Sequence, residues 1–83
     1  MFDNITNEKK LEMLETARDL HEQVLYESLI RLGIDPSTFV INNFDPSADI
    51  YPPNVEEIIQ DAVRSIAALK IVYQEMELIE GEV

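Results

Sequence analysis

Residues 55–79 read VEEIIQDAVRSIAALKIVYQEMELI, and this stretch decides the fold. Apolar residues recur in it at alternating steps of four and three: Val55, Ile59, Ala62, Ile66, Leu69, Tyr73 and Met76. Such a heptad repeat keeps one edge of an α-helix facing a partner helix. We therefore predict a helix over about residues 55–80.

The apolar surface of this helix is wider than the heptad repeat. Further apolar residues flank the repeat: Ile58, Val63, Ala67, Ala68, Ile71, Val72, Leu78 and Ile79. A chain of 83 residues has little other mass to cover them. We therefore expect a homodimeric four-helix bundle that associates through the C-terminal half of this helix. The expected oligomer interface consists of Ile66, Leu69, Ile71, Val72, Tyr73, Met76, Leu78 and Ile79.

A second helix is predicted over about residues 7–32. Its apolar face consists of Leu11, Leu14, Ala17, His21, Val24, Leu25, Ser28, Leu29 and Leu32. Thr6 or Asn7 can cap its start, and Pro36 forbids its continuation. The expected core of the molecule is formed by Leu14, Ala17, Val24, Leu25, Leu29, Ile59, Ala62, Ile66, Leu69, Tyr73 and Met76.

The end of the first helix and the start of the second both carry residues that are typical of helix caps. Gly33 suits a residue in the left-handed conformation after the first helix, and Ile34 should fold back onto Leu29. Asn54 as N-cap, with Glu57 three residues later, resembles a capping box for the second helix. The resulting architecture is one all-α domain over residues 1–83, with an N-terminal arm over 1–6 and a connector over 33–54.

The connector is long for a two-helix domain and is rich in large apolar residues, which argues against disorder. These residues are Phe39, Val40, Ile41, Phe44, Ile50 and Tyr51. We expect it to be partly ordered and to cover one flank of the second helix near Val63 and Ala67. Asp-Pro-Ser occurs at both 35–37 and 45–47, and each copy predicts a turn or a single-turn helix, with an extended stretch near 38–41. An antiparallel hairpin is the simpler arrangement, although this connector would also reach between parallel helices.

Charge narrows the range of partners. Seventeen acidic residues against six basic ones give a formal net charge of −11. This charge argues against direct binding to nucleic acid or to an anionic membrane, both of which require basic residues. A basic protein partner, or one that itself binds nucleic acid, fits better. The alternative interpretation is that the charge only keeps an apolar-rich chain in solution.

The uncompensated charge gathers in and next to the connector. No basic residue occurs between Arg31 and Arg64, whereas six acidic residues do. In a hairpin this end would be both acidic and aromatic, which suits docking to a basic protein. The candidate partner-binding residues are Tyr26, Ile30, Asp35, Phe39, Phe44, Asp45, Asp49, Tyr51, Glu56 and Glu57. Alternatively, the aromatic rings fold onto the helices and the acids cap turns and the second helix.

An acidic row also runs along the first helix. It consists of Glu8, Glu12, Glu15, Asp19 and Glu22, at steps of four and three residues. The row could imitate a phosphate backbone, or it could be the solvated face of an amphipathic helix. Arg18 is placed to neutralise part of it. Tyr26 and Ile30 continue the line of this row and would be a binding spot unless the connector or an oligomer covers them.

Catalytic and ligand-binding motifs are missing. There is no cysteine, no Gly-rich phosphate loop and no Glu-x-x-His pair, because Arg18 stands three residues before His21. His21, the only histidine, could be a proton switch across a dimer but fits a core position better. We predict a protein without enzymatic activity, cofactor or metal. No basic leader or long apolar segment is evident, so we expect a cytoplasmic protein that does not insert into membranes.

These features favour a small adaptor or inhibitor that binds another protein and is built on a helical homo-oligomer. One alternative is a nucleic-acid mimic that occupies the basic groove of a DNA- or RNA-binding protein, as some phage and mobile-element proteins do. The other is a structural subunit whose surplus apolar surface is buried in a larger assembly.

Overall fold

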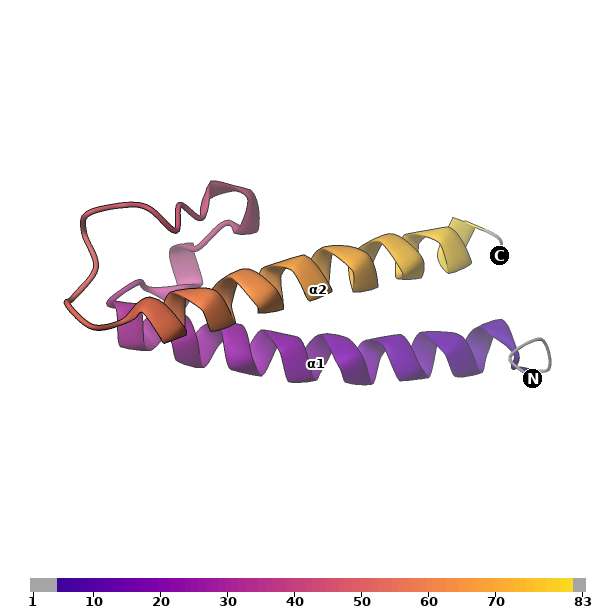
Figure 1. Ribbon diagram of the computed structural model, residues 1–83. Helices are drawn as coiled ribbons and strands as arrows, with labels where there is room; N and C mark the ends of the chain where they lie inside the picture. Colours follow the sequence, from indigo (N-terminus) through magenta and orange to yellow (C-terminus); the bar gives the residue numbers. More distant parts are fainter. Residues whose placement is uncertain (1–4, 82–83) are drawn as a thin grey trace.

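The computed structural model describes residues 5–81 as an antiparallel hairpin of two long helices (Figure 1). Helix α1 spans Asn7–Leu32 and helix α2 spans Glu56–Gly81. Two short 3-10 helices, η2 (Pro36–Thr38) and η3 (Ile41–Asn43), lie in the connector, and no strand occurs within residues 5–81. The predicted all-α hairpin is therefore confirmed. Residues 1–4 of the expected N-terminal arm lie outside the described residues.

Both ends of α1 form as the sequence indicates. The Thr6 hydroxyl accepts a hydrogen bond of 3.1 Å from the Lys9 backbone N–H. At the other end Gly33 has a φ of 81°, and the Ile34 N–H donates to the Leu29 carbonyl over 2.9 Å. This backward bond is the mark of a Schellman motif, and it directs the Ile34 side chain onto the core.

The start of α2 differs from the prediction. Asn54 has a φ of 62°, whereas an N-cap residue is extended. The first intrahelical bond is instead accepted by the carbonyl of Val55, from the Ile59 N–H at 2.9 Å. The predicted capping box of Asn54 and Glu57 is therefore wrong. Asn54 reverses the chain after Pro53, and asparagine tolerates the left-handed conformation better than most residues do.

The core lies between the helices. Five of the predicted core residues are buried: Leu25, Leu29, Ala62, Ile66 and Leu69. Four others are half-buried: Leu14, Ala17, Ile59 and Met76. The prediction was wrong for Val24, which is 44% exposed, and for Tyr73, which lies at the edge of the core. The buried residues left out of that prediction are Ser28, Leu32, Ser65, Val72 and Ile79.

On α2 these differences arise because another face of the helix than the predicted one is buried. The residues that face α1 form a second heptad repeat: Ile58, Ala62, Ser65, Leu69, Val72, Met76 and Ile79. This repeat shares Ala62, Leu69 and Met76 with the repeat read from the sequence. Ile66 lies outside this second repeat but is nevertheless buried in the core. Both repeats are present in the sequence, so periodicity alone could not select between them.

The connector folds back over the helix pair (Figure 1). Four of its residues pack against the core: Ile34, Phe39, Ile41 and Phe44. It does not cover Val63 or Ala67 as predicted, since both are exposed. The first Asp-Pro-Ser forms η2, whereas the second forms only a turn, and Ile41 already begins η3. The extended stretch is accordingly shorter than expected.

The hairpin itself uses much of the surface that we assigned to an oligomer. Four residues of the expected interface are buried within the single chain: Ile66, Leu69, Val72 and Ile79. Ile71 and Leu78 are about 60% exposed, at 61% and 59%. Of the surplus apolar surface expected on the C-terminal half of α2, Ile71 and Leu78 are the most exposed residues within residues 5–81, and Tyr73 is 39% exposed.

Leu69 is fully buried and Ile71 is exposed, which provides a matched pair for testing the packing. We expect Leu69→Ala to lower the free energy of unfolding by about 2–5 kcal/mol, because it removes a buried side chain and leaves a cavity. Ile71→Ala should change it by less than about 1 kcal/mol. Denaturant unfolding followed by circular dichroism measures both. Equal losses for the two variants would contradict the packing described here.

Gly33 and Gly81 form a second matched pair, because an added Cβ meets no atom within 4 Å at either position. Gly33→Ala should nevertheless destabilise the protein by about 1 kcal/mol, since alanine is strained in the left-handed conformation. Gly81→Ala should be neutral or slightly stabilising because alanine favours a helix. Thermal melts of both variants check this difference, and a neutral Gly33→Ala would argue against the Schellman motif.

Candidate interaction surface

The connector is held by two identical hydrogen-bond patterns. Asp35 accepts bonds from the Ser37 N–H (3.0 Å) and hydroxyl (2.8 Å), and Asp45 accepts the same two bonds from Ser47 at the same distances. The bonds from the serine hydroxyl and then from its N–H lower the pKa of both aspartates. Both carboxylates are exposed and charged, but each has a structural role in its turn.

Three aromatic rings follow one another along the connector. The ring centroids of Phe39 and Phe44 are 5.9 Å apart in an edge-to-face arrangement, and those of Phe44 and Tyr51 are 6.3 Å apart. The Tyr51 hydroxyl donates to the Asp45 carbonyl. All three rings are half-buried. Phe39 and Phe44 pack against the core between the helices, whereas Tyr51 contacts other residues of the connector. For the two phenylalanines this is the alternative considered from the sequence.

A pocket of about 310 Å³ opens where α1, α2 and the connector meet. Leu25 and Leu69 are buried at its base, and Phe39 contributes an aromatic wall. Its exposed lining includes Tyr26 from α1 and Val40 from the connector, which are 43% and 52% exposed. The pocket is thus largely apolar and open to solvent, as small binding pockets in proteins commonly are.

One hydrogen bond ties the two helices together at this pocket. The Tyr73 hydroxyl of α2 donates to a carboxylate oxygen of Glu22 on α1 over 2.7 Å. Burial, the hydrogen bond to Glu22 and the negative charge of Glu22 raise the pKa of Tyr73 to about 12. Glu22 therefore contributes a half-buried carboxylate to a pocket whose lining is mostly apolar.

The acidic row of α1 ends at this pocket. Glu22 is both the last carboxylate of the row and part of the pocket lining. Basic side chains offset part of the row, since Arg18 pairs with Asp19 at 3.2 Å and Lys9 with Glu12 at 3.7 Å. These pairs are exposed and contribute little to stability. The row therefore combines exposed negative charge with an apolar pocket at one end.

The structure brings only some of the predicted partner-binding residues together. Tyr26 and Phe39 share the pocket, whereas Ile30 is exposed one turn further along α1. Asp49, Tyr51 and Glu56 line a separate, more polar hollow of about 260 Å³ at the loop end. The predicted candidate Glu57 is exposed in the first turn of α2.

Sequence reasoning assigned most of the pocket lining to other roles, and Glu22, Tyr73 and Val40 are examples. Glu22 was predicted only as the last acid of a row, and Tyr73 was assigned to the core and to an oligomer interface. Val40 carried no signal, because its place depends on how the connector folds. The position of Glu22 at the end of the row, next to Tyr26, was the one available clue.

Within residues 5–81 no group of three or more histidine, cysteine or acidic side chains is arranged to hold a metal ion. Over the same range, neither helix combines the length and the apolar character needed to cross a membrane. Comparison with protein-family models, with curated proteins and with solved structures gave no match.

The pKa of Tyr73 offers a direct test of the bond to Glu22. We expect the Tyr73 phenol to ionise near pH 12 instead of at its ordinary 10.0. Because the folded state raises this pKa, the stabilisation is complete below pH 10 and is lost as the pH rises from about 10 to about 12. Ultraviolet titration of the phenolate measures the shift, with Tyr73→Phe identifying the signal.

Glu22→Gln is the matched variant for this titration, because it keeps the shape of the side chain and removes its charge. It should bring the pKa of Tyr73 part of the way back toward 10.0, leaving the shares that are due to burial and to the hydrogen bond, which the glutamine carbonyl can still accept. An unchanged titration in Glu22→Gln would show that the charge of Glu22 does not act on Tyr73.

Proposed function

We propose that this protein is a non-enzymatic adaptor or inhibitor that binds a basic segment of a partner protein. The binding surface in this proposal is the acidic row of α1 together with the pocket lined by Tyr26, Val40 and Tyr73. The observation that carries the proposal is that a row of exposed carboxylates leads into an open apolar pocket.

This arrangement fits a ligand with two properties. An apolar or aromatic side chain would enter the pocket of about 310 Å³ and act as the anchor. Lysine and arginine residues beside that anchor would face the acidic row and set the orientation and the association rate. Glu22, at the boundary between the two regions, would accept a hydrogen bond from a basic residue next to the anchor.

The length of the row limits the size of the segment. From Glu8 to Glu22 the helix rises by about 21 Å, at about 1.5 Å per residue. An extended peptide covers that distance with about six residues. A short basic stretch that ends in an apolar anchor therefore matches the whole surface.

We further propose that the cytoplasmic form of the protein is a homodimeric four-helix bundle. Support comes from the large side chains that stay exposed on both helices, including Met13 and Leu20 on α1 and Ile71 and Leu78 on α2. Exposed apolar surface of this extent commonly marks an interface.

A nucleic-acid mimic is the second candidate, and the regular spacing of the acidic row favours it. Such a mimic would offer carboxylates in place of phosphates to a basic groove. Two features weigh toward the peptide-binding module instead. Arg18 and Lys9 interrupt the negative charge of the row, and a phosphate backbone has no counterpart of the apolar pocket. A structural subunit of a larger assembly is the third possibility, and the exposed residues of α1 and α2 favour it only in a general way.

The test uses a synthetic lysine-rich peptide with one tryptophan at its end, and the same peptide with serine in place of tryptophan. We expect the first to bind and Tyr26→Ala to weaken its binding about tenfold, since an anchor contact is worth more than about 1 kcal/mol. Val40→Ser should act in the same direction. Leu78→Ser, an exposed apolar position away from the pocket, is the control. Isothermal titration calorimetry gives the affinities.

Salt separates the two leading candidates. A pocket-anchored peptide should keep part of its affinity at high salt, because burial of the anchor is not screened. A nucleic-acid mimic should bind a DNA-binding protein with a steep salt dependence, and duplex DNA should displace it. Equal binding of both peptides, or an unchanged affinity in Tyr26→Ala, would exclude the pocket as the binding site.

A further inference from the structure

Helix α1 carries a heptad repeat that the hairpin leaves largely exposed, with only Lys10 and Ala17 half-buried among its members. Its members step by three and four residues: Lys10, Met13, Ala17, Leu20, Val24, Glu27 and Arg31. The large apolar members are exposed, with Leu20 at 60% and Met13 at 51%. An apolar heptad repeat with charged residues at both ends is the pattern of a helix that pairs with another helix. We call these seven residues the α1 strip.

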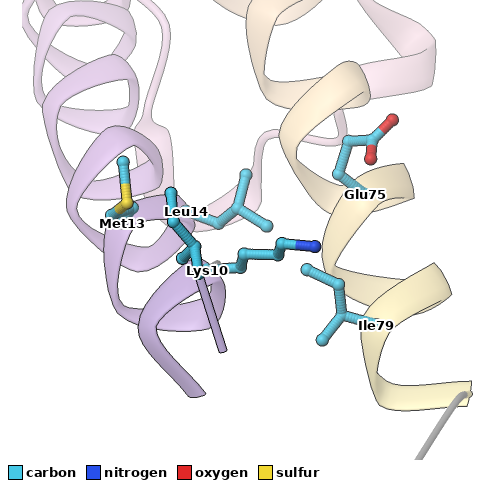
Figure 2. A pocket seen from close by; sticks show the side chains of 6 residues that line it. Lys10, Met13, Leu14, Glu75 and Ile79 are labelled. Carbon is cyan, nitrogen blue, oxygen red and sulfur yellow. The ribbon is translucent and has the colours of Figure 1, made fainter. Parts of the chain in front are cut away.

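The α1 strip lies away from the proposed peptide site. Tyr26 follows Val24 by two residues, which is about 200° around the helix. The connector and the pocket occupy the Tyr26 side. Near the chain ends, Lys10 and Met13 line an apolar hollow of about 230 Å³ together with Ile79 of α2 (Figure 2). A partner on the α1 strip would therefore leave the peptide site free.

The α1 strip is complementary to itself in one orientation. If two copies of α1 pair in antiparallel fashion about a two-fold axis between Ala17 and Leu20, Ala17 of each copy faces Leu20 of the other. Met13 and Val24 then form the next layer outward. The last layer places Lys10 of each copy opposite Glu27 of the other, so each end of the interface gains a pair of opposite charges.

Other arrangements of two copies lack this match. In a parallel pairing Lys10 of one copy would face Lys10 of the other, and Glu27 would likewise face Glu27. An interface built on Leu78 of α2 would lie within residues 74–80, which contain three acidic residues and no basic one. In a chain of net charge −11, a contact that includes basic residues lowers the repulsion between two copies.

We propose that a second copy of this chain docks on the α1 strip in antiparallel orientation. This inference rests on the dimer in the proposed function, and it places the interface on α1 instead of the C-terminal half of α2. In the single chain the Lys10 side chain extends toward Glu75 and Ile79 of α2 (Figure 2). On dimerisation it turns outward to Glu27 of the other copy, which its flexible four-carbon stem allows.

The central test measures mass in solution by light scattering. The wild-type protein should have twice the 9.5 kDa mass of one chain. Leu20→Glu should give a folded monomer, because Leu20 is exposed in the hairpin and its replacement leaves the core intact. Ile71→Glu, at an equally exposed position on α2, should leave the dimer unchanged. A wild-type monomer, or a dimer that only Ile71→Glu dissociates, would overturn the proposal.

A charge exchange tests the orientation. Lys10→Glu and Glu27→Lys should each weaken the dimer about tenfold or more by sedimentation, because each creates two like-charge contacts. The double variant Lys10→Glu with Glu27→Lys should regain most of the wild-type affinity, since opposite charges face each other again. Additive losses in the double variant would contradict the antiparallel register.

Spin labels provide a second measure of orientation, which uses the absence of native cysteine. A label at Thr16→Cys lies close to the two-fold axis, so its distance to the other copy should be short. Labels at Lys9→Cys should be separated by about 28 Å along the helix axis, at about 1.5 Å per residue. Equal, short distances at both positions would indicate a parallel dimer and overturn the proposed register.

The outcomes for the dimer and for the peptide site are separable. Leu20→Glu should abolish dimerisation and leave the affinity for the lysine-rich tryptophan peptide unchanged per chain. Tyr26→Ala should weaken peptide binding and leave the dimer intact. If Leu20→Glu does not abolish dimerisation, the α1 strip is not the dimer interface. If Tyr26→Ala does not weaken peptide binding, the pocket is not the peptide site.

Discussion

The structure depends on one constraint, which is that α2 is apolar on more than one side while the chain has only 83 residues to cover it. Helix α1 covers the side of Ala62, Leu69 and Val72. The connector covers the adjoining side, where Phe39, Ile41 and Phe44 pack against the same core. The connector is therefore a third packing element and not a simple loop. Its length, unusual for a helical hairpin, follows from the area that it has to cover.

That constraint also produces the pocket. The connector returns over the helices as a folded segment stiffened by two Asp-Ser turns and three aromatic rings, so it does not lie flat along them. The space left between it and the helices is lined by apolar residues of all three elements. The bond from Tyr73 to Glu22 fixes the two helices at this point and keeps a carboxylate beside apolar surface. Packing and the proposed binding surface thus arise from the same arrangement.

Negative charge and apolar surface are divided between the two sides of α1. The acidic row lies on the side that leads to the pocket, which suits a basic ligand. The α1 strip lies on the other side, where Lys10 and Glu27 allow two strongly acidic chains to meet. Each proposed contact therefore brings positive charge to a surface that is mostly negative: the ligand supplies it at the acidic row, and Lys10 supplies it at the α1 strip. A dimer of this form would present two peptide sites, one on each hairpin.

The sequence by itself determined the two helices and the end of α1, because heptad spacing, Gly33 and Pro36 act locally. It also determined the acidic row and identified Tyr26 as a residue on the solvent-exposed side of α1. Only the tertiary structure decided which of the two overlapping repeats of α2 faces α1, and that choice placed Val72 and Ile79 in the core. It also decided which side of α1 faces α2, and Val24 lies outside that side. The course of the connector, and with it the roles of Val40 and Tyr73, was likewise beyond the sequence. The physical reason is that a helix with a wide apolar surface has several nearly equivalent ways to be covered. The choice among them depends on how the other elements fit together in space.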